Sequence, residues 1–175
     1  MTTQLLAATD IERLFGELNK ELASEDAHGN VYLVGGAVMC LVHAARQSTQ
    51  DVDAYFEPAD VLRSAAARVA TRQDLPASWL NDAVKAFLSD RGDFSRYLEL
   101  SHLTVYTAEP EYLLAMKCLS ARIGEEFHDV GDIQFLLRYL NLEDPAAAKA
   151  ILEKYYPLER FPQKTLYLLD ELLDR

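Results

Sequence analysis

Two aspartates, Asp51 and Asp53, are the residues whose type and spacing most clearly indicate chemistry. Side chains on a strand alternate between the two faces of a sheet, so residues two apart project from the same face. Two carboxylates on one face can share divalent cations, and their hard oxygen atoms suit Mg²⁺ or Mn²⁺ held against phosphate groups. The pair therefore predicts a metal site made by Asp51 and Asp53 and suited to displacement at phosphorus.

Gly35 and Gly36 precede this pair, between a short apolar run and a predicted helix. Glycine lets the backbone approach a ligand closely, and the start of a helix offers N–H groups to an anion. We therefore expect the two glycines to form a strand-to-helix turn that binds a triphosphate beside the aspartates. Arg46 and Thr49 come just before the aspartate strand, where they could contact the triphosphate, orient Asp51 or lie in a surface loop.

The elements that must position these residues follow from hydrophobic spacing and from breaks at proline and glycine. The pattern predicts an α/β (α+β) class, with a small mixed sheet flanked by helices and then an all-helical C-terminal part. The first helix is expected to be capped by Thr9 or Asp10. Strands are predicted over 31–34, 51–56, 97–100 and 103–107, and further helices over 37–45, 58–70, 79–88, 110–122, 130–140, 145–155 and 163–173.

The length of 175 residues predicts a single domain over 1–175, made of an α/β core over 1–107 and a helical part over 108–175. The net charge of −11, from 28 acidic and 17 basic residues, disfavours broad attraction to nucleic acid, although a local basic groove stays possible. No apolar run reaches about 18 residues and no N-terminal signal is recognisable, so we expect no membrane association and a cytoplasmic location.

Cysteine and histidine usage argues against a zinc site. Cys40 and Cys118 lie within predicted helices and are expected to be buried, reduced thiols. The four histidines have no spacing typical of metal ligands. The expected cofactor is the magnesium or manganese that the carboxylates of Asp51 and Asp53 suit.

The string VYLVGGAVMCLVHAARQSTQDVDAYF, residues 31–56, resembles the signature of the nucleotidyltransferase-fold superfamily, in which a Gly-Gly or Gly-Ser turn is followed by Asp-x-Asp. Within that superfamily the chain is most similar to a prokaryotic group of small, uncharacterised nucleotidyltransferase-like proteins. The resemblance covers about residues 31–157 and implies a nucleotidyltransferase-like fold. The further matching segments are Trp79–Asp82, Leu113–Lys117 with Arg122, Asp129–Ile133 and Tyr155–Pro157.

A looser similarity links the chain to nucleotidyltransferase toxins of the abortive-infection type. It implies that Lys117 contacts phosphate and that Asp129 or Asp132 supplies a later acid of the site. Arg122, five residues after Lys117, is expected to form a salt bridge instead. The chain departs from the pattern of these relatives in two ways. The toxins usually have serine where this chain has Gly36. Active members commonly have a third carboxylate on a later strand, for which the best candidate here is Glu99, on a predicted edge strand.

These residues together predict a metal-dependent nucleotidyltransferase that moves a nucleoside monophosphate from a nucleoside triphosphate to an acceptor hydroxyl and releases pyrophosphate. Asp51, Asp53 or Glu99 would deprotonate the acceptor, which could be a tRNA end, a protein or a small molecule. Two alternatives stay open. One is the toxin of a toxin–antitoxin pair, silenced by an antitoxin partner, and the other is a nucleotide-binding module without turnover.

Overall fold

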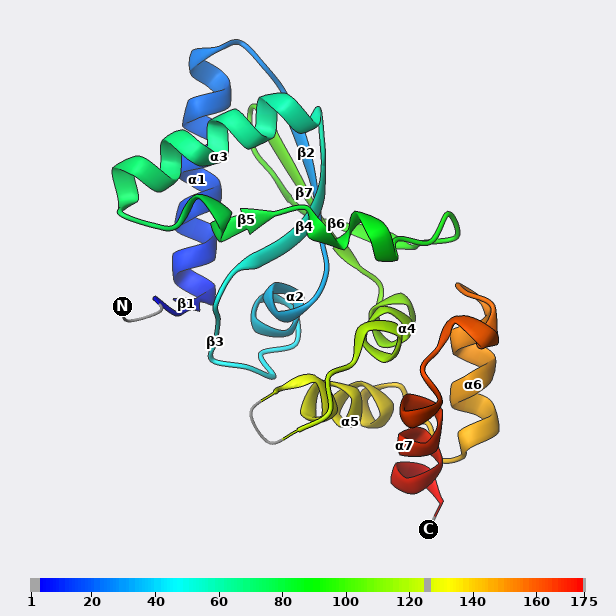
Figure 1. Cartoon of the computed structure of the whole chain (residues 1–175). Helices are drawn as coiled ribbons and strands as arrows, with labels where there is room; N and C mark the ends of the chain where they lie inside the picture. The colour runs from blue at the N-terminus through cyan, green and yellow to red at the C-terminus, as the bar shows by residue number, and fades with distance from the viewer. Residues whose placement is uncertain (1–3, 125–126, 175) are drawn as a thin grey trace. The chain divides into compact units, whose positions relative to one another are not determined.

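The computed structural model describes residues 4–124 and 127–174. The chain forms two units (Figure 1). Unit 1 combines the residues up to Ala86 with Phe94–Ala108, and unit 2 combines Phe87–Asp93 with the residues from Glu109 onward. Unit 1 contains the strands and unit 2 is helical, so the predicted mixed α/β class is confirmed. The segment Phe87–Asp93 belongs with the helical unit, which the sequence pattern did not indicate.

The centre of unit 1 is a five-stranded sheet in the order β5-β4-β2-β7-β6. The central strand β2 pairs antiparallel with β4 and parallel with β7, while β5 adds parallel to β4 and β6 adds antiparallel to β7. A separate two-stranded pair joins β1 (Leu6–Ala7) to β3 (Ser48–Thr49). The sheet strands are β2 (Gly29–Leu33), β4 (Val52–Glu57), β5 (Leu80–Asn81), β6 (Phe94–Glu99) and β7 (Leu103–Ala108).

Two helices of unit 1, α1 (Ala8–Ser24) and α3 (Ala59–Gln73), cover one face of this sheet (Figure 1). Alternate strand residues on that face are apolar and buried, because the period of two turns them all toward the helices. The buried core of unit 1 includes Ile11, Leu14, Phe15, Leu18, Val31, Leu33, Val52, Ala54, Phe56, Leu62, Val69 and Val105. The opposite face of the sheet is not covered by α1 or α3.

The strand β5 is held in place by Trp79, which is 1% exposed. The indole N–H of Trp79 donates a hydrogen bond of 2.9 Å to the carbonyl oxygen of Ala66 in α3. This contact fixes the chain just before Leu80 and Asn81, which then pair with Val52 and Asp53 of β4. A buried tryptophan thus places a two-residue strand at the edge of the sheet.

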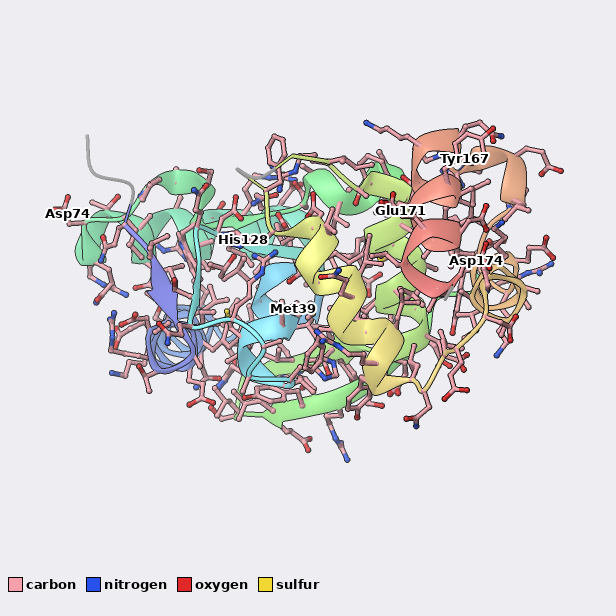
Figure 2. All side chains as sticks on the ribbon, turned by 90° about the horizontal axis from the view of Figure 1, so that it is seen from below. Met39, Asp74, His128, Tyr167, Glu171 and Asp174 are labelled. Atoms are coloured by element: carbon pink, nitrogen blue, oxygen red, sulfur yellow. The ribbon has the colours of Figure 1, made fainter. Side chains whose placement is uncertain are left out.

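Unit 2 contains four α-helices in its described part: α4 (Pro110–Ser120), α5 (Asp129–Tyr139), α6 (Pro145–Glu153) and α7 (Gln163–Leu173). Their apolar faces are buried, as the helical spacing predicts. On α7, Leu166 and Leu169 are buried while Tyr167 is 67% exposed (Figure 2). Cys118 of α4 and Cys40 of unit 1 are both buried and outside any disulfide, as expected, and burial raises the pKa of Cys118 to about 12.

The structure corrects the sequence pattern in three places. The segment predicted as one helix over 79–88 instead holds a short 3-10 turn (Ala77–Trp79), the strand β5 and a second 3-10 helix (Ala83–Phe87). The helix predicted over 37–45 is α2 (Gly36–Leu41), which is shorter. The first helix has Ala7 as its N-terminal cap, and the carboxylate of Asp10 accepts the N–H of Ala7 at 2.9 Å. Among the described residues, no helix combines the length and the apolar character needed to cross a membrane.

Gly92 gives a direct test of packing in unit 2. A Cβ at this position would lie 2.7 Å from the ring of Tyr112, which is wholly buried. We expect Gly92→Ala to lower the free energy of unfolding by about 1–3 kcal/mol, because the ring must move. The matched control is Gly131→Ala in α5, where a Cβ meets nothing within 4 Å. It should raise stability by about 0.5–1 kcal/mol, since alanine favours a helix. Urea unfolding of both variants measures this contrast, and equal shifts would contradict the packing described.

Candidate active site

Gly35 lies between β2 and α2 and has a backbone conformation that only glycine adopts readily. Its φ is 68° and its ψ is −146°. A Cβ there would lie 3.2 Å from Oδ2 of Asp53. The antiparallel pairing of β2 with β4 causes this approach, because the N–H of Val34 donates to the carbonyl oxygen of Asp53 at 3.1 Å. The glycine backbone therefore lies directly beside the carboxylate predicted to bind metal.

Gly36 is lined by the two polar residues that the sequence placed before the aspartate strand. A Cβ on Gly36 would lie 2.6 Å from Oγ1 of Thr49 and 2.8 Å from Nη1 of Arg46. The Thr49 hydroxyl also donates to the carbonyl oxygen of Asp51 at 3.2 Å. The absence of a side chain at Gly36 thus makes room for a guanidinium and a hydroxyl. We call Gly35, Gly36, Arg46 and Thr49 the glycine cradle.

The two aspartates lie at the start of β4. Asp51 directly precedes the strand and Asp53 is its second residue. The side-chain amide of Asn81 donates to Oδ2 of Asp51 at 3.3 Å, and the backbone of Asn81 is paired with that of Asp53. Residues paired directly across a sheet project from the same face, so Asn81 shares the face of the aspartate pair.

Asn81 is the residue of the candidate site that the sequence pattern does not indicate. The sequence pattern places it at the start of the predicted helix over 79–88, within Trp79–Asp82, one of the segments that carry the resemblance. Its proximity to Asp51 depends on a two-residue strand, which is too short to show an alternating pattern. The resemblance over that segment is the signal in the sequence that points to it.

Glu99, predicted as a third carboxylate, is not brought to the aspartate pair. Glu99 is paired with Thr104 of β7, and Thr104 is paired with Asn30 of β2. Asn30 is in turn paired with Glu57, at the far end of β4. Strand spacings of about 4.8 Å and a rise of about 3.3 Å per residue place Glu99 roughly 20 Å from Asp53. Its carboxylate instead accepts from the guanidinium of Arg96 at 3.1 Å.

The donor set of unit 1 fits a hard divalent cation bound together with substrate. Magnesium is commonly held by one or two carboxylates, with phosphate and water oxygens completing its coordination. Asp51 and Asp53 supply two carboxylates, and the adjacent cradle could hold the phosphates. Within the described residues, no group of three or more histidine, cysteine or acidic side chains is placed to hold a metal alone.

Lys117, Asp129 and Asp132, the remaining predicted site residues, come together in unit 2. The ammonium of Lys117 lies 2.8 Å from Oδ2 of Asp132 and 3.5 Å from Oδ1 of Asp129, and all three residues are buried. The predicted salt bridge of Arg122 is also present, since its Nε lies 3.0 Å from Oδ2 of Asp129. A buried lysine needs such partners. A phosphate contact by Lys117 stays a prediction.

The pKa of Asp129 reflects these contacts. Burial opposes its ionisation, but hydrogen bonds from the backbone N–H and guanidinium of Arg122, together with the charge of Lys117, lower the pKa below its usual value. A carboxyl whose pKa is lower in the folded state stabilises the fold above the unfolded pKa of about 3.9. That contribution is lost as the pH falls through the lowered folded pKa.

Asp129→Asn tests this arrangement. At pH 7 we expect the substitution to lower the free energy of unfolding by about 2 kcal/mol, the scale of a lost hydrogen bond to a buried charge. The difference in unfolding free energy from the unchanged protein should shrink as the pH falls from about 4 through the lowered folded pKa, where Asp129 becomes neutral in the folded state as well. Urea unfolding at several pH values measures it. Asp60→Asn is the control, since that carboxylate is 99% exposed, and a pH-independent difference for Asp129→Asn would contradict the account.

Comparison with known proteins identifies a family to which the chain is similar. Residues 9–144 of the 175 match the model of a family described as "Nucleotidyltransferase of unknown function (DUF6036)". No curated protein and no solved structure matches the chain. The matched range includes the glycine cradle, the aspartate pair, Asn81 and the ion pairs of Lys117 with Asp129 and Asp132. The chain therefore belongs to this family of nucleotidyltransferases of unknown function.

Proposed function

We propose that this chain transfers a nucleoside monophosphate from a nucleoside triphosphate to an acceptor hydroxyl and releases pyrophosphate. The observation that best supports this is the convergence within unit 1 of the glycine cradle and the aspartate pair, with Gly35 beside Asp53 and Gly36 beside Arg46 and Thr49. Family membership supports a general role in nucleotidyl transfer. The metal, the substrate and the residue roles that follow are part of the proposal.

The glycine cradle, the aspartate pair and Asn81 each have a proposed physical role in this reaction. Asp51 and Asp53 would hold Mg²⁺ or Mn²⁺, which when bound would neutralise phosphate charge in the transition state. Arg46 and Thr49 would bind the triphosphate through a guanidinium and a hydroxyl, both good partners for phosphate oxygens. Gly35 and Gly36 would let the phosphates approach the backbone. The amide of Asn81, which donates to Asp51, would keep that carboxylate in place.

The acceptor oxygen forms a bond to the α-phosphorus as the bond to the pyrophosphate oxygen breaks. The acceptor proton must leave in the same reaction, and a carboxylate within hydrogen-bond reach can take it. Asp51 or Asp53 is proposed as this base. Glu99 is too distant for the role by the strand register.

One observation favours a second candidate, a nucleotide-binding module without transfer. The residue paired with Asp53 on the neighbouring strand is an amide, Asn81, instead of a third acid. Fewer carboxylates hold fewer cations, so this site could bind a nucleotide with a single metal and leave the acceptor unactivated. Binding and transfer must therefore be measured separately. The toxin alternative would appear as transfer to a tRNA or a protein.

Gly36→Ala tests whether the cradle binds the triphosphate. The new methyl group would displace the Thr49 hydroxyl or the Arg46 guanidinium, which lie 2.6 and 2.8 Å from the Cβ position. We expect about a tenfold or greater loss of affinity for Mg²⁺-nucleotide, the scale of one charge-assisted hydrogen bond. Isothermal titration measures it. Gly16→Ala, at an open position of α1, should bind as the unchanged protein does, and equal affinity in both variants would argue against a phosphate site here.

The transfer itself is tested with each α-labelled nucleoside triphosphate, Mg²⁺ or Mn²⁺ and a cell extract. The unchanged protein should move label to a discrete product, and Asp51→Asn and Asp53→Asn should each lower the rate by about 100-fold or more. Both variants keep the shape of the side chain and remove its charge. Metal-dependent nucleotide binding without any labelled product would support the binding module. Absence of nucleotide binding would remove both proposals.

A further inference from the structure

The face of the sheet opposite α1 and α3 carries a row of aromatic residues in unit 1. Tyr32 of β2 is paired with Tyr55 of β4 and with Tyr106 of β7. The ring of Tyr32 lies 4.7 Å from that of Tyr106 and 5.9 Å from that of Tyr55, and the ring of Phe94 lies 5.3 Å away on its edge. All four side chains are partly exposed. We call these four residues the tyrosine row.

The tyrosine row lies next to the aspartate pair and on the side away from the glycine cradle. Along β4, Asp53 and Tyr55 are two residues apart, so they share a face and are separated by about 7 Å. Thr49 and Gly36 lie toward the start of that strand, beyond Asp51. The order on this face is therefore cradle, aspartate pair and tyrosine row.

This order has a chemical consequence for a displacement at phosphorus. The attacking and leaving oxygens lie roughly in line on opposite sides of the phosphorus. If the cradle holds the leaving pyrophosphate and the aspartates hold the reacting phosphate, the acceptor must approach from the side of the tyrosine row.

The charges of this face indicate which acceptor fits. The next row of paired residues has Glu57 at one end and Glu99 at the other, and the hydroxyl of Tyr55 donates to Glu57 at 2.6 Å. The one basic residue paired into the tyrosine row is Arg96, which is already bonded to Glu99. Because Arg96 offsets the charge of Glu99, Glu57 remains as an acidic group beside the rings. Its carboxylate attracts a cation and repels a polyanion, and the ring faces attract a cation through their electrons.

We propose that the tyrosine row is the acceptor-binding subsite and that the acceptor is a small hydroxyl compound carrying a positive charge. This inference rests on the proposed transferase function and adds the class of acceptor to it. The rings pack against the body of the acceptor, Glu57 attracts its cationic group, and its hydroxyl is directed to the phosphorus beside Asp53. The acceptor hydroxyl loses its proton to an aspartate as the oxygen–phosphorus bond forms and pyrophosphate leaves.

The test separates a cell extract into small cations, small neutral compounds, small anions, RNA and protein. Each fraction is incubated with the full-length chain, α-labelled nucleoside triphosphate and Mg²⁺. We expect a labelled product from the small-cation fraction. Tyr55→Leu should lower kcat/KM for that acceptor by about tenfold, the scale of a lost cation–ring contact, and leave nucleotide affinity unchanged. Tyr55→Phe, which keeps the ring, should retain most of the rate.

Tyr139→Leu is the matched control, because Tyr139 is 54% exposed on a helix of unit 2. Label moving only to neutral compounds, anions, RNA or protein would overturn the acceptor class while leaving the transferase function standing. A cationic product formed equally well by Tyr55→Leu would overturn the location. Metal-dependent nucleotide binding with no product from any fraction would overturn transfer itself, together with this inference.

Discussion

The antiparallel pairing of β2 with β4 is the interaction on which the rest of the site depends. It places the glycine turn after one strand against the acidic start of the other, so that Gly35 lies 3.2 Å, measured from its Cβ position, from the carboxylate of Asp53. A slip of one residue in this register would turn the aspartates to the helix side of the sheet. The apolar residues Val31, Leu33 and Ala54 prevent that slip, because they are buried under the helices. The core of unit 1 therefore determines which face carries the chemistry.

The same alternation assigns different tasks to the two faces of the sheet. One face is apolar and packs against α1 and α3, while the other carries the aspartate pair, the tyrosine row and the charged residues Glu57 and Glu99. Unit 2 differs, since the buried charged residues in its described part form an ion network in which Lys117 lies between two carboxylates. The proposed catalytic function needs only residues of unit 1. The family match nevertheless extends into unit 2.

Much of the fold could be predicted because its signals are local. Helical spacing and proline placement predicted the four helices of unit 2 to within two residues at every end, and Gly-Gly followed by Asp-x-Asp predicted the elements that carry the cradle and the aspartates. What failed depends on contacts between distant segments. The strand β5 exists because Trp79 is anchored to α3 and Leu80 pairs with Val52, neither of which is visible in a window of sequence. Glu99 was misjudged for the same reason, since its distance from Asp53 follows from register across three strand pairs.

The central claim is that metal and nucleotide bind together at the junction of the glycine cradle and the aspartate pair. Paramagnetic broadening of amide resonances by Mn²⁺, recorded with a non-hydrolysable nucleoside triphosphate analogue, tests it most directly because it maps the ion without requiring turnover. The account predicts that broadening centres on Gly35, Gly36, Asp53 and Asn81, is weaker at Glu57 and Glu99, and is lost in Asp53→Asn. Broadening that centres elsewhere, or that persists unchanged in Asp53→Asn, would contradict it.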